Sequence, residues 1–195
     1  MTKISTPMKK SIEALTFLLV LASNFSFAKQ HSKEAVFALF VETSSVLVDS
    51  SHAAYARDQV AAELAGLNFR IVTPESVTQA VESLRDGSGN TNMKVLEDNN
   101  MQTLALQLEA DYFIHFTLNE FRSESKDLPR FDRKIFQHRL KGNFRVASSH
   151  SNASVFGKSL SAEKKIPVTS NVIIETSKSG MINQLIDQLV KELVH

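Results

Sequence analysis

The strongest constraint on the fold lies between residues 112 and 146, where apolar and polar side chains alternate with a period of two residues. Because successive side chains of a strand point to opposite faces, this alternation predicts two strands, the second of them half-buried and antiparallel. Residues 122–134 predict a charged loop between the two strands, and residues 155–160 predict a third strand after a turn. The inward positions of the second strand are Phe136, His138, Leu140, Phe144 and Val146.

The segments before residue 112 alternate between strand and helix patterns. A continuous apolar run at 36–41 predicts a strand that is buried on both faces. Apolar residues recur at helical spacing in 52–65 and 96–109, and Thr73-Pro74-Glu75 provides a cap, a first-turn proline and an acidic residue for another helix. With a short strand at 69–72 and a final helix at 181–194, the order is β-α-β-α-α-β-β-β-α. It predicts an α/β fold of α+β-like type, a single mixed sheet with helices packed against it.

The first 28 residues have the pattern of a secretory signal peptide. Three lysines precede an apolar run at 14–22, which is followed by the small-residue stretch Ser26-Phe27-Ala28. The run is too short to cross a hydrocarbon layer of roughly 30 Å, so no stable membrane anchor is expected after cleavage. We therefore expect residues 1–28 to be removed and residues 29–195 to form a single α/β envelope domain that is periplasmic or secreted.

Composition narrows the possible functions. The chain has no cysteine, which excludes cysteine-based zinc sites and the lipid attachment of a bacterial lipoprotein. Loss of the leader changes the net charge from +1 to −1. A nearly neutral domain provides no electrostatic argument for binding nucleic acid.

No segment predicts a catalytic, cofactor or metal site. Asp49-Ser50-Ser51-His52 contains the residue types of a hydrolytic triad, but neighbours in sequence cannot converge as a triad requires, so a turn with a helix cap is the preferred interpretation. A loop centred on Leu128-Pro129 would place His115 opposite Gly142, too far from His138 to share a metal ion. Both histidines are expected to be structural.

Two features could bind a partner. Arg139, Lys141 and Arg145 lie two or four residues apart on one predicted strand, so they share a face, which Lys158 could join. A polar face exposed to solvent is the alternative interpretation. The second feature is the predicted loop at 122–134, which holds Leu128 and Phe131 among charged residues.

Several segments together resemble a known family. They are residues 60–72 (VAAELAGLNFRIV) with the following Thr73-Pro74-Glu75, residues 104–118 (LALQLEADYFIHFTL), residues 140–157 (LKGNFRVASSHSNASVFG) and a leucine-rich final helix. Their order resembles the family of the penicillin-binding-protein activator lipoproteins and the curli-secretion channel subunit. The common domain of that family is similar to the amino-terminal domain of the Tol-Pal translocation protein. The resemblance implies a non-catalytic cell-envelope domain that docks on another protein.

These observations favour an exported, soluble, non-catalytic binding module, a regulator or accessory factor of a peptidoglycan synthase or of an envelope assembly. Its partner would be another envelope protein, with a penicillin-binding protein as one candidate. The alternatives are a small-ligand carrier, with a pocket lined by Phe37, Phe40, Phe113 and Phe116, and, less favoured, a hydrolase. The hydrolase would use Asp49 and His52 near the carboxyl ends of the strands.

Overall fold

The computed structural model describes residues 35–45, 47–87, 96, 98–128, 133–150, 156–167 and 174–194, so the expected leader lies outside the described residues. The strands are β1 (Val36–Thr43), β2 (Arg70–Ile71), β3 (Tyr112–Leu128), β4 (Arg133–Ser148) and β5 (Phe156–Pro167). The helices are α2 (Ser50–Gly66), α3 (Pro74–Gly87), α4 (Asp98–Gln107) and α5 (Ile174–Val194). The predicted order of elements is confirmed.

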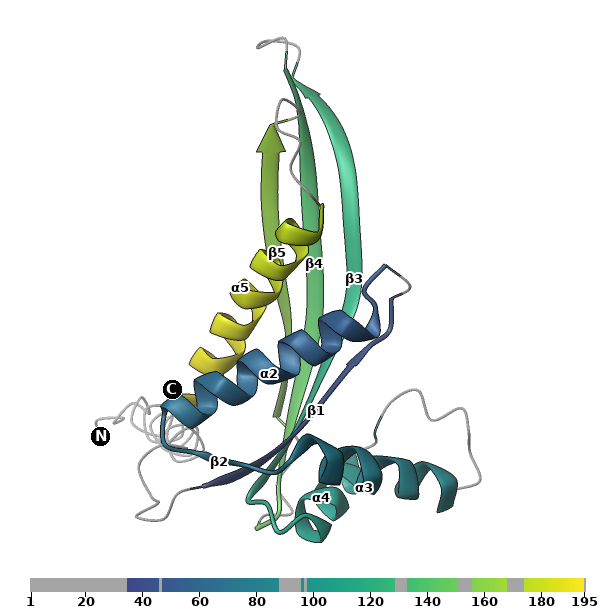
Figure 1. Cartoon of the computed structure of the whole chain (residues 1–195), viewed down its shortest axis with the longest axis vertical. Helices are drawn as coiled ribbons and strands as arrows, with labels where there is room; N and C mark the ends of the chain where they lie inside the picture. Colours follow the sequence, from purple (N-terminus) through teal and green to yellow (C-terminus); the bar gives the residue numbers. More distant parts are fainter. Residues whose placement is uncertain are drawn as a thin grey trace, which may run out of the picture.

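The five strands form one mixed sheet in the order β2-β1-β3-β4-β5 (Figure 1). Strand β1 is parallel to both of its neighbours, whereas β3, β4 and β5 form an antiparallel meander. The predicted fold class, a single mixed sheet with packed helices, is therefore confirmed.

Each face of the sheet has its own hydrophobic core. Helices α2 and α5 cover one face, and α3 and α4 cover the other near β1 and the start of β3 (Figure 1). Phe37 and Phe116 belong to the first core, whereas Phe113 and Phe40 belong to the second. The four phenylalanines proposed to line one ligand pocket thus lie on opposite faces of the sheet, and that prediction is wrong.

The predicted loop at 122–134 is also wrong, because strand structure continues through most of it. Strand β3 runs to Leu128 and β4 begins at Arg133, which leaves only residues 129–132 between the two strands. Strands exposed on both faces carry no hydrophobic alternation, so the sequence pattern did not show them. Strand β5 also extends beyond the predicted 155–160, to Pro167, and α5 begins seven residues before the predicted 181.

The register of the β3–β4 hairpin differs from the one expected. His115 lies opposite Arg145 rather than Gly142, and His138 lies opposite Ser123. The turn is centred near residues 130–131, about two residues later than assumed, and a bulge shifts the pairing between Leu118 and Glu120. The two histidines are consequently farther apart along the strands than expected, which agrees with separate structural roles.

The bulge lies at the point where β1 stops pairing with β3. Strand β1 ends at Thr43, which pairs with Leu118, and the backbone N–H of Ser44 donates to the Leu118 carbonyl at 3.0 Å. Beyond this point three of the described strands continue: β3, β4 and β5. We call Glu120–Leu128, Arg133–Lys141 and Ser161–Pro167 the extension, and the rest of the sheet with its helices the base. The extension rises beyond α2 in Figure 1.

Candidate functional site

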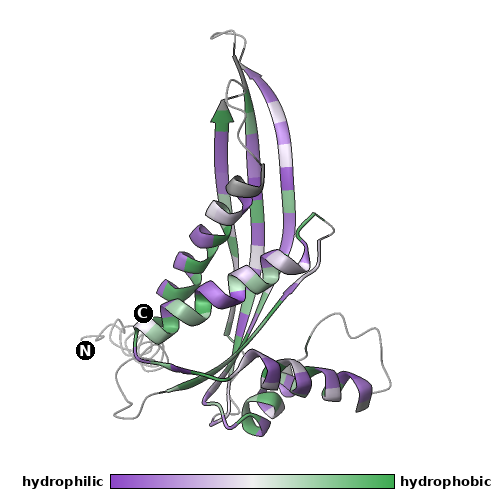
Figure 2. Cartoon of the chain, in the orientation of Figure 1, coloured by the Kyte–Doolittle hydropathy of each residue, from purple (hydrophilic) through white to green (hydrophobic). Residues whose placement is uncertain are grey.

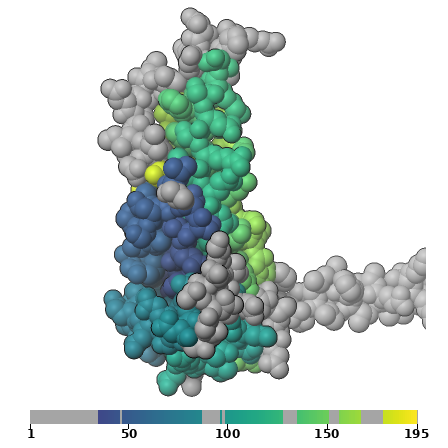
Figure 3. All heavy atoms as spheres, turned by 90° about the vertical axis from the view of Figure 1, so that its right-hand side faces the viewer, coloured from purple at the N-terminus to yellow at the C-terminus, as the bar shows by residue number. Residues whose placement is uncertain are grey.

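The extension has one face on which no described helix packs (Figures 1 and 3). In register, Glu120 pairs with Lys141 and Arg139 pairs with Glu163, which places these side chains on that face. We call it the open face. Figure 2 shows hydrophilic residues recurring along this part of β3. Its described charged residues are Arg122, Lys126, Arg139, Lys141 and Lys165, which are cationic, and Glu120, Glu124 and Glu163, which are anionic.

Opposite charges on the open face are paired across the strands. Arg139 Nη2 lies 3.2 Å from Glu163 Oε2, and Lys141 Nζ lies 3.1 Å from Glu120 Oε2. Hydrogen bonds from Lys141 and Arg122 hold the pKa of the Glu120 carboxyl below its ordinary value. The five cations outnumber the three carboxylates among the described residues, so the face is a mixed-charge ladder with a positive excess.

The structure separates the residues that the sequence grouped as a basic stripe. Arg139 and Lys141 are exposed side by side on the open face. Arg145 has the same orientation but lies in the base, where its half-buried guanidinium donates to the Leu96 carbonyl beside α4. Lys158 lies opposite Phe144, on the other face of the sheet, and pairs with Glu192 of α5 at 2.5 Å.

The two apolar residues proposed for partner binding fall at the end of the hairpin. Leu128 is the last residue of β3 and lies opposite Arg133 in the register. Phe131 lies outside the described residues. Leu128 is thus at the tip of the extension, far along the strand from the bulge.

A polar cluster that the sequence pattern missed lies beside the carboxyl end of β1, where its parallel pairing with β3 stops. Glu42 Oε1 lies 2.9 Å from His115 Nε2, and Thr117 Oγ1 lies 3.2 Å from the same nitrogen. Arg85 of α3 donates to Glu42 Oε2 at 3.1 Å, and its guanidinium carbon lies 5.5 Å from the Phe40 ring centre. Glu42 and His115 are 73 residues apart in the sequence, so only strand pairing brings them together.

The cluster is buried enough to alter the ionisation of its carboxylate. His115 is only 3% exposed. Burial opposes ionisation of Glu42, but hydrogen bonds and charge from His115 and Arg85 outweigh it and hold its pKa below the ordinary value. The Glu42 carboxylate therefore joins the sheet to α3.

The same geometry argues against nucleophilic catalysis at this cluster. A hydrolytic triad places the carboxylate and the hydroxyl on different nitrogens of the imidazole. Here Glu42 and Thr117 both approach Nε2 of His115. Carboxyl ends of parallel strands are common ligand sites in α/β sheets, but this arrangement fits a clamp between the sheet and α3.

The expected turn and helix cap at residues 49–52 is confirmed. The Asp49 side chain accepts hydrogen bonds from the backbone N–H groups of Ser51 and His52 at the start of α2. Bonds from the Ser51 hydroxyl and His52 hold the pKa of Asp49 far below its ordinary value. Ser51 Oγ and His52 Nδ1 both contact Asp49 Oδ1, at 2.6 and 2.7 Å. The hydroxyl is therefore bonded to the carboxylate, whereas in a hydrolytic triad it is bonded to the imidazole.

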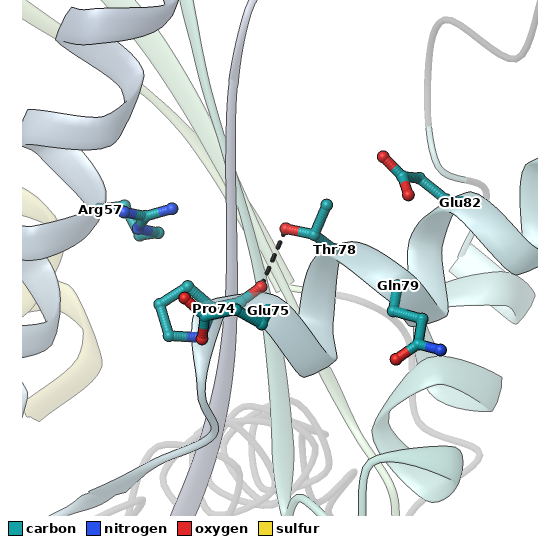
Figure 4. A pocket seen from close by; sticks show the side chains of 6 residues that line it. All are labelled: Arg57, Pro74, Glu75, Thr78, Gln79 and Glu82. Carbon is teal, nitrogen blue, oxygen red and sulfur yellow. Dashed lines mark hydrogen bonds between the residues drawn. The ribbon is translucent and has the colours of Figure 1, made fainter.

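An open pocket of about 330 Å³ lies between α2 and α3 (Figure 4). It is lined by Arg57, Pro74, Glu75, Thr78, Gln79 and Glu82. The Thr78 hydroxyl donates to the Pro74 carbonyl at 2.9 Å, and Arg57 donates to its neighbour Asp58. Among the described residues no group of three histidine, aspartate or glutamate side chains could hold a metal ion.

Comparison with known proteins adds information on the fold only. No family model matches the sequence, and no curated protein is similar to it. The chain is similar to the solved structure of hypothetical protein CT253 from Chlamydia trachomatis, with a TM-score of 0.56, 14% identity, and coverage of 83% of this chain and 96% of that one. This likeness supports the α+β architecture.

Weaker likenesses are found to two other bacterial proteins. Lipoprotein GNA1162 from Neisseria meningitidis has a TM-score of 0.46 and 15% identity, with coverage of 82% and 97% of the two chains. The LpoB C-terminal domain from Salmonella enterica has a TM-score of 0.43 and 11% identity, with coverage of 74% and 94%. At these values neither likeness assigns a function. In the part of the chain that the structure describes, no helix is sufficiently long and apolar to span a membrane.

Proposed function

We propose that this chain is an exported, non-catalytic binding module of the bacterial cell envelope that docks on another envelope protein. The leader pattern at residues 1–28 supports export. The resemblance of the sequence to the penicillin-binding-protein activators supports a docking role and makes a penicillin-binding protein the first partner to test. The geometry of the Glu42 and Asp49 clusters supports the non-catalytic part of the proposal.

The extension is the observation that carries this proposal. Its strands project beyond the helices of the base, and its open face exposes paired charges with a positive excess. A hydrogen-bonded sheet holds such side chains at fixed spacing, which suits recognition of a complementary charged surface. Arg139 and Lys141 lie on this face and are the contact residues we propose, with Leu128 and Phe131 in the hairpin end as a second contact.

The size of the open face indicates the kind of complex to expect. Nine residues of β3 span about 30 Å, and three strands span about 14 Å, which gives a face of roughly 400 Å². Stable complexes bury about 800 Å² on each partner. Docking through this face alone would therefore be weak and transient, and its association rate would depend on salt concentration.

Charge reversal tests the proposed contact. We expect the double variant Arg139→Glu/Lys141→Glu to weaken partner binding by more than about ten-fold, because like charges then face the partner. Arg145 is replaced separately, since its bond to the Leu96 carbonyl gives it a structural role. Crosslinking in intact cells followed by mass spectrometry identifies the partner, and surface plasmon resonance with that partner measures the affinity.

The matched control has the same change in charge on the other side of the molecule. Lys158 and Lys191 are exposed, Lys158 on the opposite face of the sheet and Lys191 on α5. The variant Lys158→Glu/Lys191→Glu should leave the affinity within about two-fold of the original. Equal losses in both variants, or no loss in the first, would rule out the open face as the docking surface.

A further inference from the structure

On the face opposite the open face, the extension carries three stacked rings. The ring of His138 lies 5.7 Å from that of Phe121 and 6.1 Å from that of Phe136, with an angle of 15° between the planes in both pairs. We call Phe121, His138 and Phe136 the aromatic strip. Phe121 is buried, whereas Phe136 at the other end is 40% exposed. The strip therefore ends in an accessible ring surface.

Two lysines lie beside the aromatic strip. Lys178 of α5 places its ammonium 5.4 Å from the centre of the Phe121 ring. Lys164 of β5 lies opposite His138 in the strand register, and no carboxylate lies within ion-pair distance of it in the described part of the chain. Asp127 is on the same face, opposite Lys134, and is a diagonal neighbour of Phe136 on the β3 side. Lys164 therefore supplies positive charge on the β5 side of Phe136, across the strand from Asp127.

The histidine contributes an uncharged ring to this surface. His138 is only 3% exposed, and its Nδ1 atom has no hydrogen-bond partner in the part of the chain that the structure describes. Burial, with a smaller effect of Lys164, holds its pKa below the ordinary value, so the imidazole is neutral at neutral pH. The strip thus combines an apolar ring stack with the Lys164 ammonium, which has no carboxylate within ion-pair distance among the described residues.

We propose that the aromatic strip and Lys164 bind an extended segment of a partner protein in which an acidic and an aromatic residue are separated by one residue. Phe136 lies opposite Ile166 and His138 opposite Lys164, so Phe136 and Lys164 are diagonal neighbours roughly 7–8 Å apart. Alternate residues of an extended chain point to one side at a spacing of about 7 Å. The aromatic residue would stack on Phe136, and the carboxylate would meet Lys164.

This site is independent of the proposed docking through Arg139 and Lys141, because the two surfaces lie on opposite faces of the extension. Its test uses defined peptides and requires no knowledge of the natural partner. The probe is acetyl-Ser-Glu-Ser-Phe-Ser-Glu-Ser-amide, which places glutamate and phenylalanine on one side of an extended chain. The control is its isomer acetyl-Ser-Ser-Glu-Phe-Glu-Ser-Ser-amide, in which they point to opposite sides.

Binding is measured by NMR titration of the isotope-labelled exported protein. We expect saturable shifts of the ring signals of Phe136 and His138 with the probe peptide, and binding about three-fold weaker with the isomer, which cannot engage both groups. Equal binding of the two peptides would overturn the proposal. So would the absence of saturable shifts at the strip, or binding to phosphatidylglycerol vesicles together with no preference between the peptides.

Variants of two adjacent lysines sharpen the test. Lys164 and Lys165 are neighbours on β5 whose side chains point to opposite faces. Lys164→Gln should weaken binding of the probe peptide about three-fold, and Phe136→Ala about ten-fold, whereas Lys165→Gln should leave it unchanged. None of the three side chains is buried, so the variants should remain folded. An equal effect of Lys165→Gln and Lys164→Gln would show a general charge effect and refute the site.

Discussion

The base and the extension of this molecule use the same sheet in different ways. In the base, helices cover both faces, and β3 side chains such as Phe113 and Phe116 have no exposed surface. In the extension, one face is open and even an aromatic residue of the other face, Phe136, is 40% exposed. The comparison indicates that apolar burial in the base holds the fold together, whereas the extension presents side chains to the surroundings.

The boundary between the two regions has a simple structural cause. Strand β1 ends beside Leu118, and the bulge between Leu118 and Glu120 follows at once. A bulge adds a residue to one strand and increases the local twist. The extension therefore leaves the layers of the base just where it loses its fourth strand.

The largest expected effect compares one phenylalanine from each region. Phe116→Ala would leave a cavity in the base and should lower the free energy of unfolding by about 3–5 kcal/mol. Phe136→Ala removes a partly exposed ring and should lower it by less than about 1 kcal/mol. Urea unfolding followed by circular dichroism measures both. Similar losses in the two variants would contradict the division into a stabilising base and a presenting extension.

An intermediate effect is expected from the buried polar cluster of the base. Glu42→Gln removes a carboxylate bonded to His115 and Arg85 and should lower the free energy of unfolding by about 1–3 kcal/mol near neutral pH. The folded-state pKa of Glu42 is lower than its ordinary value of 4.5, so its contribution is present above that pH and is lost as pH falls through the folded-state pKa. The difference between the two proteins should therefore shrink on acidification.

Urea titrations at a series of pH values from about 7 to about 3 measure this difference. The control is Glu124→Gln, which changes an exposed carboxylate of the extension. Its effect on stability should stay small across the series. A constant difference for Glu42→Gln at all pH values would show that the Glu42 carboxylate does not stabilise the base.

The smallest effect is expected for the ion pairs of the open face. Glu163→Gln removes the carboxylate that faces Arg139 at 3.2 Å and Lys165 at 3.5 Å. Because these groups are exposed, the free energy of unfolding should fall only slightly, with a smaller change at high salt. Thermal unfolding at low and high salt measures it. A loss as large as that of Glu42→Gln would mean that the ladder supports the fold.

Sequence reasoning reached most of the fold because the base has strong local signals. The apolar run at 36–41 and the alternation around Phe116 and Phe144 predicted a sheet, and these residues lie in β1, β3 and β4. The sequence Thr73-Pro74-Glu75 predicted the start of a helix, and α3 begins at Pro74. The extension was missed because its residues are polar on the open face, so the pattern of residues 122–134 was typical of a loop. Arg139, Lys141 and Arg145 share one face of β4 as predicted, but Arg145 lies in the base, where it donates to the Leu96 carbonyl.

The sequence by itself determined the order of the elements, the inward faces of the buried strands and the cap at Asp49, because these depend on neighbours in the chain. Only the tertiary structure decided the register of the hairpin and the length of the extension. It also decided the meeting of Glu42 with His115 and of His138 with Phe121 and Phe136. These features depend on pairing between distant segments, and one bulge and a turn two residues later were enough to change which side chains meet.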